Sequence, residues 1–332
     1  MSRGAPPPAI PAMPMTPIDL VGSQDFSQSA PVAPISDQVI DPLAFPPPVV
    51  DKLPAPTRRS NPGPMERCDG EVQRVLRIDT FDGAKVELQK VLGPNFVTAH
   101  TMYMGSSQHE KGAFYTFATT LVLNDALLIG RLDNSQRVEA QWHQPYFGAL
   151  SRFSHRFQGQ ISPTEGMQGM LDIERKGDTN TMGVKLGLGL FGASLFQSVT
   201  PRLALGAEAM HIQRLGKTVF TARGRYTDNN HTAVATVSTG SGTASVAFLR
   251  RVSNRVGLAA ELEVAAANLN SHMHVGAEFT MRQAKFTANV TSTGVLQATL
   301  QDVVGPNCFL LLSGMVDHRN DLYRFGVGVQ LG

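Results

Sequence analysis

A glycine-rich stretch is the first feature of this sequence whose spacing could do chemistry. Gly187, Gly189 and Gly192 fit the GxGxxG pattern of a phosphate-binding loop. Such a loop opens a helix and has an acidic residue about twenty positions further on, whereas the residues up to Pro201 make a poor helix. We therefore expect these glycines at a strand turn and on one face of a strand.

Two histidines are the second candidate. His272 and His274 would place two imidazoles on one face of a strand, as in part of a transition-metal site, but no third ligand lies nearby in the sequence. A polar pair at a strand end explains them better. Cys68 and Cys308 lie in no CxxC motif or Cys/His cluster, and there is no nucleophile elbow, HExxH or Walker motif. The sequence thus predicts no enzyme, metal or cofactor.

The composition narrows the class of protein. The chain has 332 residues, 42% of them apolar, with 29 Lys and Arg against 27 Asp and Glu. A dedicated nucleic-acid binder carries a marked basic excess, so no nucleic-acid partner is expected. There is no apolar stretch of a secretory signal and no window of the ~18–20 apolar residues of a spanning helix. The protein is therefore either soluble or a closed β-barrel, which leaves no backbone group unpaired in hydrocarbon.

The N-terminal region differs from the rest. Sixteen of the 21 prolines lie in residues 1–64. We expect a disordered Pro-rich arm over residues 1–65, which serves as a tether or, alternatively, as a PxxP docking site. A short helix and linker should follow over residues 66–82, because Val72, Val75 and Leu76 recur at helical spacing.

Residues 83–332 alternate between apolar and polar or small residues, with turn residues between the runs. The last run shows this most clearly, with apolar residues at Tyr323, Phe325, Val327, Val329 and Leu331. About nineteen such runs can be counted, at a spacing that fits strands of ~9–11 residues tilted across a bilayer. An open sheet of that size would have exposed edges, and closure removes them. The sequence predicts an all-β fold, closed into a β-barrel of about 19 strands.

The alternation alone does not say which face meets lipid, because a packed soluble core leaves the same pattern. The strand number favours a transmembrane β-barrel over a soluble one, because a barrel of this size has a lumen too wide for side chains to fill. A wide lumen suggests a channel.

Three segments carry a resemblance to a known family: residues 128–141 (LIGRLDNSQRVEAQ), 196–208 (FQSVTPRLALGAE) and 318–332 (HRNDLYRFGVGVQLG). They resemble the channel-forming subunits of the translocase of the outer mitochondrial membrane (TOM complex), within the eukaryotic mitochondrial porin superfamily. The resemblance implies a nineteen-stranded barrel with parallel first and last strands, a short helix in the lumen, and import of unfolded precursor proteins across that membrane.

The implied partners are mitochondrial precursor proteins with their presequences, presequence receptors, small single-helix subunits, other copies of the barrel and membrane lipid. The C-terminal strand also looks like an outer-membrane sorting signal, polar-x-Gly-x-x-hydrophobic-x-hydrophobic. Its four defining positions are Arg324, Gly326, Val329 and Leu331.

Carboxylates on the polar face of the strands are the candidate site. They are either ordinary solvated groups or a path that attracts Arg-rich, acid-poor presequences. The set is Glu87, Glu139, Asp172, Glu174, Glu208, Glu261, Glu263 and Glu278. Cations share that face, so the lumen should be mixed in charge: Lys85, Arg152, Arg156, Lys185, Lys285 and Arg324. The alternative functions are an anion or metabolite channel of the same superfamily, with a predominantly basic lumen, and a soluble all-β interaction protein.

Overall fold

The structure is a computed structural model that describes residues 59–107, 112–146, 152–163 and 166–332. The expected arm over residues 1–65 lies almost wholly outside the described residues. Three short helices are present in the described part: η1 (Met65–Arg67), α1 (Gly70–Leu76) and η3 (Gln213–Leu215). None of the helices in these ranges is long and apolar enough to span a membrane.

Nineteen strands follow the first two helices. The first ten are β1 (Gly83–Gly93), β2 (Phe96–Met104), β3 (Ala113–Leu123), β4 (Ala126–Asp133), β5 (Val138–Pro145), β6 (Phe153–Ser162), β7 (Gly166–Lys176), β8 (Asn180–Gly187), β9 (Leu190–Ser198) and β10 (Leu203–Ile212). The other nine are β11 (Lys217–Thr227), β12 (His231–Ser238), β13 (Thr243–Ser253), β14 (Val256–Ala265), β15 (Ser271–Thr280), β16 (Ala284–Thr291), β17 (Val295–Gly305), β18 (Cys308–Asp317) and β19 (Leu322–Leu331).

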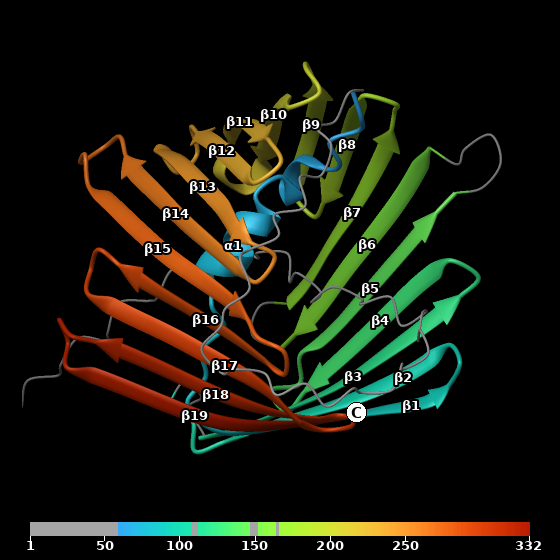
Figure 1. Ribbon diagram of the computed structural model, residues 1–332. Coiled ribbons are helices and arrows are strands. Elements are labelled where there is room, and N and C mark those ends of the chain that lie inside the picture. The colour runs from blue at the N-terminus through green and yellow to red at the C-terminus, as the bar shows by residue number, and fades with distance from the viewer. Residues whose placement is uncertain (1–58, 108–111, 147–151, 164–165) are drawn as a thin grey trace, which may run out of the picture. The chain divides into compact units, whose positions relative to one another are not determined.

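The strands form one closed sheet in which sequence neighbours are antiparallel (Figure 1). An odd number of alternating strands leaves the first and last pointing the same way, and β1 pairs with β19 in parallel from Gly83–Gly326 to Leu88–Leu331. This confirms both the strand number and the parallel closure. Closure leaves no sheet edge exposed.

The face on which the polar residues lie is the lumen. Side chains that contact the helical segment inside the ring, such as Lys185, Arg223 and Asn289, belong to the polar phase of their strands. The opposite phase is apolar and faces out, with Phe325 and Val327 of β19 67% and 53% exposed. A soluble barrel would bury these side chains, so the outer wall has the character of a lipid-facing band.

The GxGxxG stretch is a hairpin, as predicted. Gly187 ends β8, Gly192 lies in β9, and Gly189 sits in the turn between them with φ +79°, which favours glycine. It is followed by a strand, so a nucleotide loop is excluded at this position.

Candidate functional site

A segment inside the barrel, residues 61–82, shapes the lumen; we call it the inner segment. Its helix α1 lies within the ring of strands and contacts β13, β14, β15 and β16 (Figure 1). The apolar stripe predicted from the sequence is the docking face: Val72, Val75 and Leu76 are at most 3% exposed. They join a buried cluster with Phe196, Val234 and Leu249 of the wall. Each such side chain contributes about 1.5–3 kcal/mol to docking when fully buried.

One wall glycine makes this close approach possible. A Cβ on Gly276 of β15 would lie 2.8 Å from the carbonyl oxygen of Val75 and 3.3 Å from Cδ2 of Leu76. The helix backbone therefore rests directly on the strand, and Asn289 of β16 donates a hydrogen bond to the Leu76 carbonyl.

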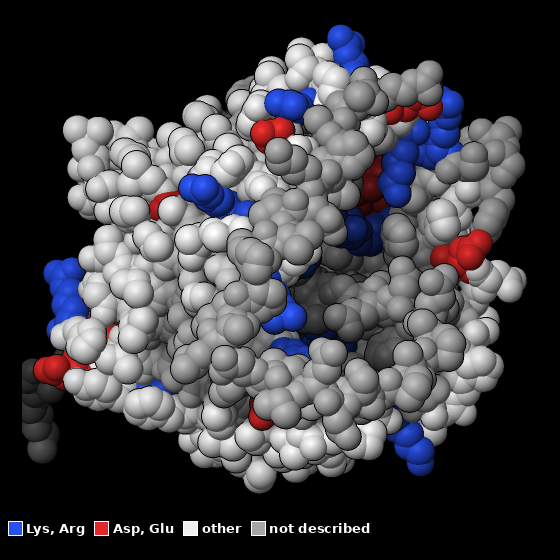
Figure 2. All heavy atoms as spheres, viewed as in Figure 1, with Lys and Arg blue, Asp and Glu red and all other residues white. Residues whose placement is uncertain are grey.

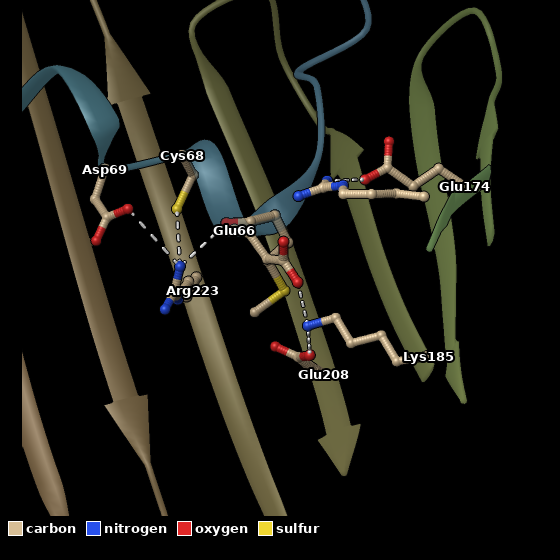
Figure 3. Close-up of polar contacts among 9 residues, drawn as sticks. Glu66, Cys68, Asp69, Glu174, Lys185, Glu208 and Arg223 are labelled. Atoms are coloured by element: carbon tan, nitrogen blue, oxygen red, sulfur yellow. Dashed lines mark hydrogen bonds and ion pairs between the residues drawn. The ribbon is translucent and has the colours of Figure 1, made fainter. Parts of the chain in front are cut away.

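Ion pairs hold the first half of the inner segment (Figure 3). Lys185 of β8 bridges Glu66 of the segment and Glu208 of β10. Arg223 of β11 donates to the Met65 carbonyl at 3.2 Å and lies 3.9 Å from the Asp69 carboxylate. Burial raises the pKa of the Glu66 carboxyl, but the hydrogen bond and charge of Lys185 outweigh it, so that this pKa lies below its ordinary value.

Further contacts distribute the docking over the wall. Glu71 pairs with Arg225 at 3.7 Å and with Arg251 at 3.2 Å. Gln73 donates to the Glu261 carboxylate of β14 at 3.2 Å. At the start of the segment, Asn61 donates to the backbone carbonyl of Gly177 at 2.6 Å.

The end of the inner segment is fixed beside the β1–β19 junction. The Phe81 amide donates to Ser313 Oγ of β18 at 2.9 Å, and the Phe81 ring lies over β19, where a Cβ on Gly326 would be 2.6 Å from its Cδ2. The Asp82 carboxylate accepts hydrogen bonds from the Ser106 hydroxyl at 2.5 Å and from the Ser107 amide at 2.7 Å. Burial opposes ionisation of Asp82, but these hydrogen bonds prevail and lower its pKa to about 2.

All eight predicted carboxylates lie in the lumen phase of their strands, in an uneven distribution. Glu261 and Glu263 of β14 are in register with His274 and His272 of β15, and Glu278 lies further along β15. Asp172, Glu174 and Glu208 lie on β7 and β10, on the side of the wall where η1 docks. Glu87 and Glu139 lie apart from both groups, on β1 and β5.

Most of these carboxylates already have partners. The ion pairs are Glu87–Lys85 (2.7 Å), Glu139–Arg137 (2.9 Å), Glu174–Arg156 (3.3 Å), Glu208–Lys185 and Glu278–Lys285 (3.2 Å). Within the described ranges, Asp172, Glu261 and Glu263 have no ion-pair partner. Asp172 is 4% exposed and Glu261 accepts hydrogen bonds from Gln73, so Glu263 is the more accessible unpaired carboxylate of the set.

The four positions of the predicted sorting signal all lie on β19, two on its outward face and two on its lumen face. Val329 and Leu331 belong to the outward phase of β19, and Leu331 is 41% exposed. Gly326 faces the lumen beneath Phe81, and Arg324 shares that phase.

Among the lumen cations that escaped the sequence analysis are three that contact the inner segment: Arg223, Arg225 and Arg251. The alternation of Arg223 and Arg225 with Gly224 and Tyr226 in β11 is the signal that would have found the first two. Of the predicted cations, Arg152 lies outside the strands, in the turn before β6, and pairs with Asp178 at 3.2 Å.

The histidine pair gains neighbours that the sequence did not reveal, since His272 and His274 lie opposite Glu263 and Glu261. Even so, no group of three His, Cys, Asp or Glu side chains in the described ranges is arranged to hold a metal ion.

A hollow opens in the middle of the face shown in Figure 2, and Lys and Arg atoms lie within it. The geometry is thus a wall of nineteen strands around a polar interior, partly occupied by the docked inner segment. Such an arrangement can conduct charged or polar solutes.

A family model described as eukaryotic porin matches residues 61–326. The chain belongs to the eukaryotic porin family. The match begins at the first residue of the inner segment and ends in β19, so it spans nearly all of the barrel of this porin.

Curated relatives of this porin in animals and in a plant are named as mitochondrial import receptor subunits. It is 28% identical to the mitochondrial import receptor subunit TOM40 homolog of Xenopus tropicalis, over 86% of this chain and 90% of the relative. Identity is also 28% to the Homo sapiens homolog, over 82% and 78% of the two chains, and to the probable TOM40-2 of Arabidopsis thaliana, over 80% and 88%. These relatives confirm the resemblance to the TOM channel subunits.

Among solved structures, a triple mutant of Rhodopseudomonas blastica porin superposes with a TM-score of 0.50 at 9% identity. The match covers 71% of this chain and 98% of that one. At this identity the similarity shows the β-barrel fold alone.

Proposed function

We propose that this porin is the protein-conducting channel through which unfolded precursor proteins cross the mitochondrial outer membrane. The observation that carries the proposal is the similarity to import receptor subunits over four-fifths or more of the chain. The barrel supplies what that role needs: a closed wall, an apolar outer face and a polar lumen. The protein resides in that membrane as a multi-pass β-barrel, and its role requires no enzymatic step or cofactor.

The experiment is reconstitution into planar bilayers with a synthetic presequence peptide. We expect voltage-dependent flicker block by the peptide, and none by a matched peptide in which the arginines are replaced by glutamates. Absence of block by the presequence, or a strong anion preference in a salt gradient, would contradict the proposal; the latter result favours an anion channel.

At the level of residues, the carboxylate group on β14 and β15 is our choice for contact with presequences. Glu261, Glu263 and Glu278 lie together on one part of the wall, and Glu263 has no ion-pair partner in the described ranges. Exposed contacts of this kind contribute about 0–1 kcal/mol each, and a conduit must release what it binds.

Replacing these three residues with Gln should reduce import of precursors with presequences more than import of carrier-type precursors. The control is a variant in which Glu87 and Glu139, on another part of the wall, are replaced by Gln. Equal reduction of both precursor classes, or an equal effect of the control, would remove this assignment.

We further propose that presequence receptors, small single-helix subunits and other copies of the barrel pack on the outer wall, together with lipid. The exposed apolar residues of that wall, such as Phe325 and Val327, suit such neighbours. Co-purification of these subunits in mild detergent, and their loss in a harsher one, is the expected result.

A further inference from the structure

One part of the wall carries far more positive than negative charge. Strands β8 to β13 contain a single carboxylate, Glu208. Four cations of the same strands contact the inner segment, and we call these four residues the basic strip: Lys185, Arg223, Arg225 and Arg251. Without the inner segment, this side of the lumen would attract anions.

The inner segment places its own acids against these cations. Glu66 contacts Lys185, Asp69 lies 3.9 Å from Arg223, and Glu71 lies 3.7 Å and 3.2 Å from Arg225 and Arg251. With Glu208, four carboxylates therefore meet four cations. The charges of the strip are balanced only while the segment is docked.

The exposed face of the inner segment does not neutralise the basic strip, because its charged residues are mostly arginines. Arg67, Arg74 and Arg77 are exposed and have no ion-pair partner in the described ranges. They contribute the same positive charge in every variant considered below.

We propose that Glu66, Asp69 and Glu71 are specificity-determining residues of the channel: they neutralise the basic strip and thereby keep the lumen permeable to cations and basic peptides. This inference rests on the proposed function, because it assigns the ion selectivity of the same conduit. An ion passing within about one Debye length of the strip experiences its charges together, whereas paired charges largely cancel.

The test is the reversal potential of single channels in a KCl gradient. In the segment variant Glu66→Gln, Asp69→Asn, Glu71→Gln, we expect the ratio of K⁺ to Cl⁻ permeability to fall about two- to tenfold, since three charges become uncompensated within screening distance. A balanced variant, which adds Arg223→Gln, Arg225→Gln and Arg251→Gln, restores the net charge and should restore the wild-type ratio. An unchanged ratio in the segment variant, or no recovery in the balanced variant, overturns the inference.

A single-charge comparison separates pairing from net charge. Asp79→Asn removes one carboxylate of the same segment that is exposed and has no ion-pair partner in the described ranges. Its effect should be smaller than that of Glu71→Gln, which releases both Arg225 and Arg251. Equal shifts would mean that only net charge matters, and would overturn the inference.

The wall can also be tested from its own side. Arg223→Gln, Arg225→Gln and Arg251→Gln, without changes in the segment, should raise the cation preference. This variant decides the question if the segment variant forms no channels, and a lowered or unchanged preference overturns the inference. If the wild-type protein itself forms no channel, the proposed function fails; if it does and the variants leave its selectivity unchanged, only the inference fails.

Discussion

Docking of the inner segment depends on the absence of a side chain at Gly276, and Gly276→Ala tests this directly. The added methyl would lie 2.8 Å from the Val75 carbonyl oxygen and 3.3 Å from Leu76 Cδ2, whereas ordinary carbon contacts are about 3.5–4.0 Å. The helix must therefore move away from β15 by a few tenths of an ångström or more. Overpacking of this kind costs about 1–3 kcal/mol.

That cost is a large part of the local docking energy. Burial of Val75 and Leu76 contributes about 1.5–3 kcal/mol each, and the Asn289 hydrogen bond about 0.5–1.5 kcal/mol. The substitution weakens all three contacts. The population of undocked segment should rise about tenfold for each 1.4 kcal/mol lost, which gives about 5- to 150-fold.

Limited trypsin digestion of the reconstituted protein measures that population. Arg74 and Arg77 lie next to the affected contacts, and cleavage there follows the undocked fraction when docking is fast relative to proteolysis. The matched control is Gly257→Ala on β14, where the nearest atom to the new Cβ would be Leu249 Cδ1 at 3.9 Å. Unchanged cleavage in Gly276→Ala, or equal acceleration in the control, would refute the reasoning.

Two further predictions concern the ends of the barrel. The pKa of Asp82 is lowered to about 2, so its hydrogen bonds stabilise the docked end of the segment fully above the ordinary pKa of 3.8 and progressively less as the pH falls towards 2. In the wild type, pepsin sensitivity of the segment should therefore rise as the pH falls over that interval. A flat profile in the wild type, or the same rise in Asp82→Asn, would contradict this prediction. Replacing Gly326 with Asp and Leu331 with Lys should block membrane assembly without affecting translation, as measured by carbonate extraction. Because a Cβ on Gly326 would meet both the backbone carbonyl oxygen and the ring of Phe81, Leu331→Lys alone separates sorting from packing: normal assembly of that variant would contradict the sorting assignment.

Local patterns predicted much of the fold. The alternation of Phe325, Val327 and Val329 with Arg324, Gly326 and Gly328 describes β19 as the structure has it, and the helical spacing of Val72, Val75 and Leu76 describes the docking face of α1. The bounds of α1 differ from the expected ones: the helix begins at Gly70, and residues 66–69 belong partly to the separate turn η1.

The sequence predicted which face of the wall the carboxylates occupy, but not which of them form ion pairs. That Glu139 and Glu208 face the lumen follows from the two-residue period of a strand. That they pair with Arg137 and Lys185 depends on side-chain rotamers and on the register between strands, which the period does not give. Arg251 was missed because it follows another arginine, Arg250, and the alternation alone does not say which of the two faces the lumen.

The sequence by itself determined the strand number, the apolar and polar phases of each strand and the amphipathic helix, because each is a periodicity within ten or so neighbouring residues. Only the tertiary structure decided which charges compensate one another. Glu66 meets Lys185, and Gln73 meets Glu261 across 188 positions of sequence, because closure of the barrel brings distant strands around one short segment. Pairing across such separations depends on how the whole sheet closes, and no local pattern encodes it.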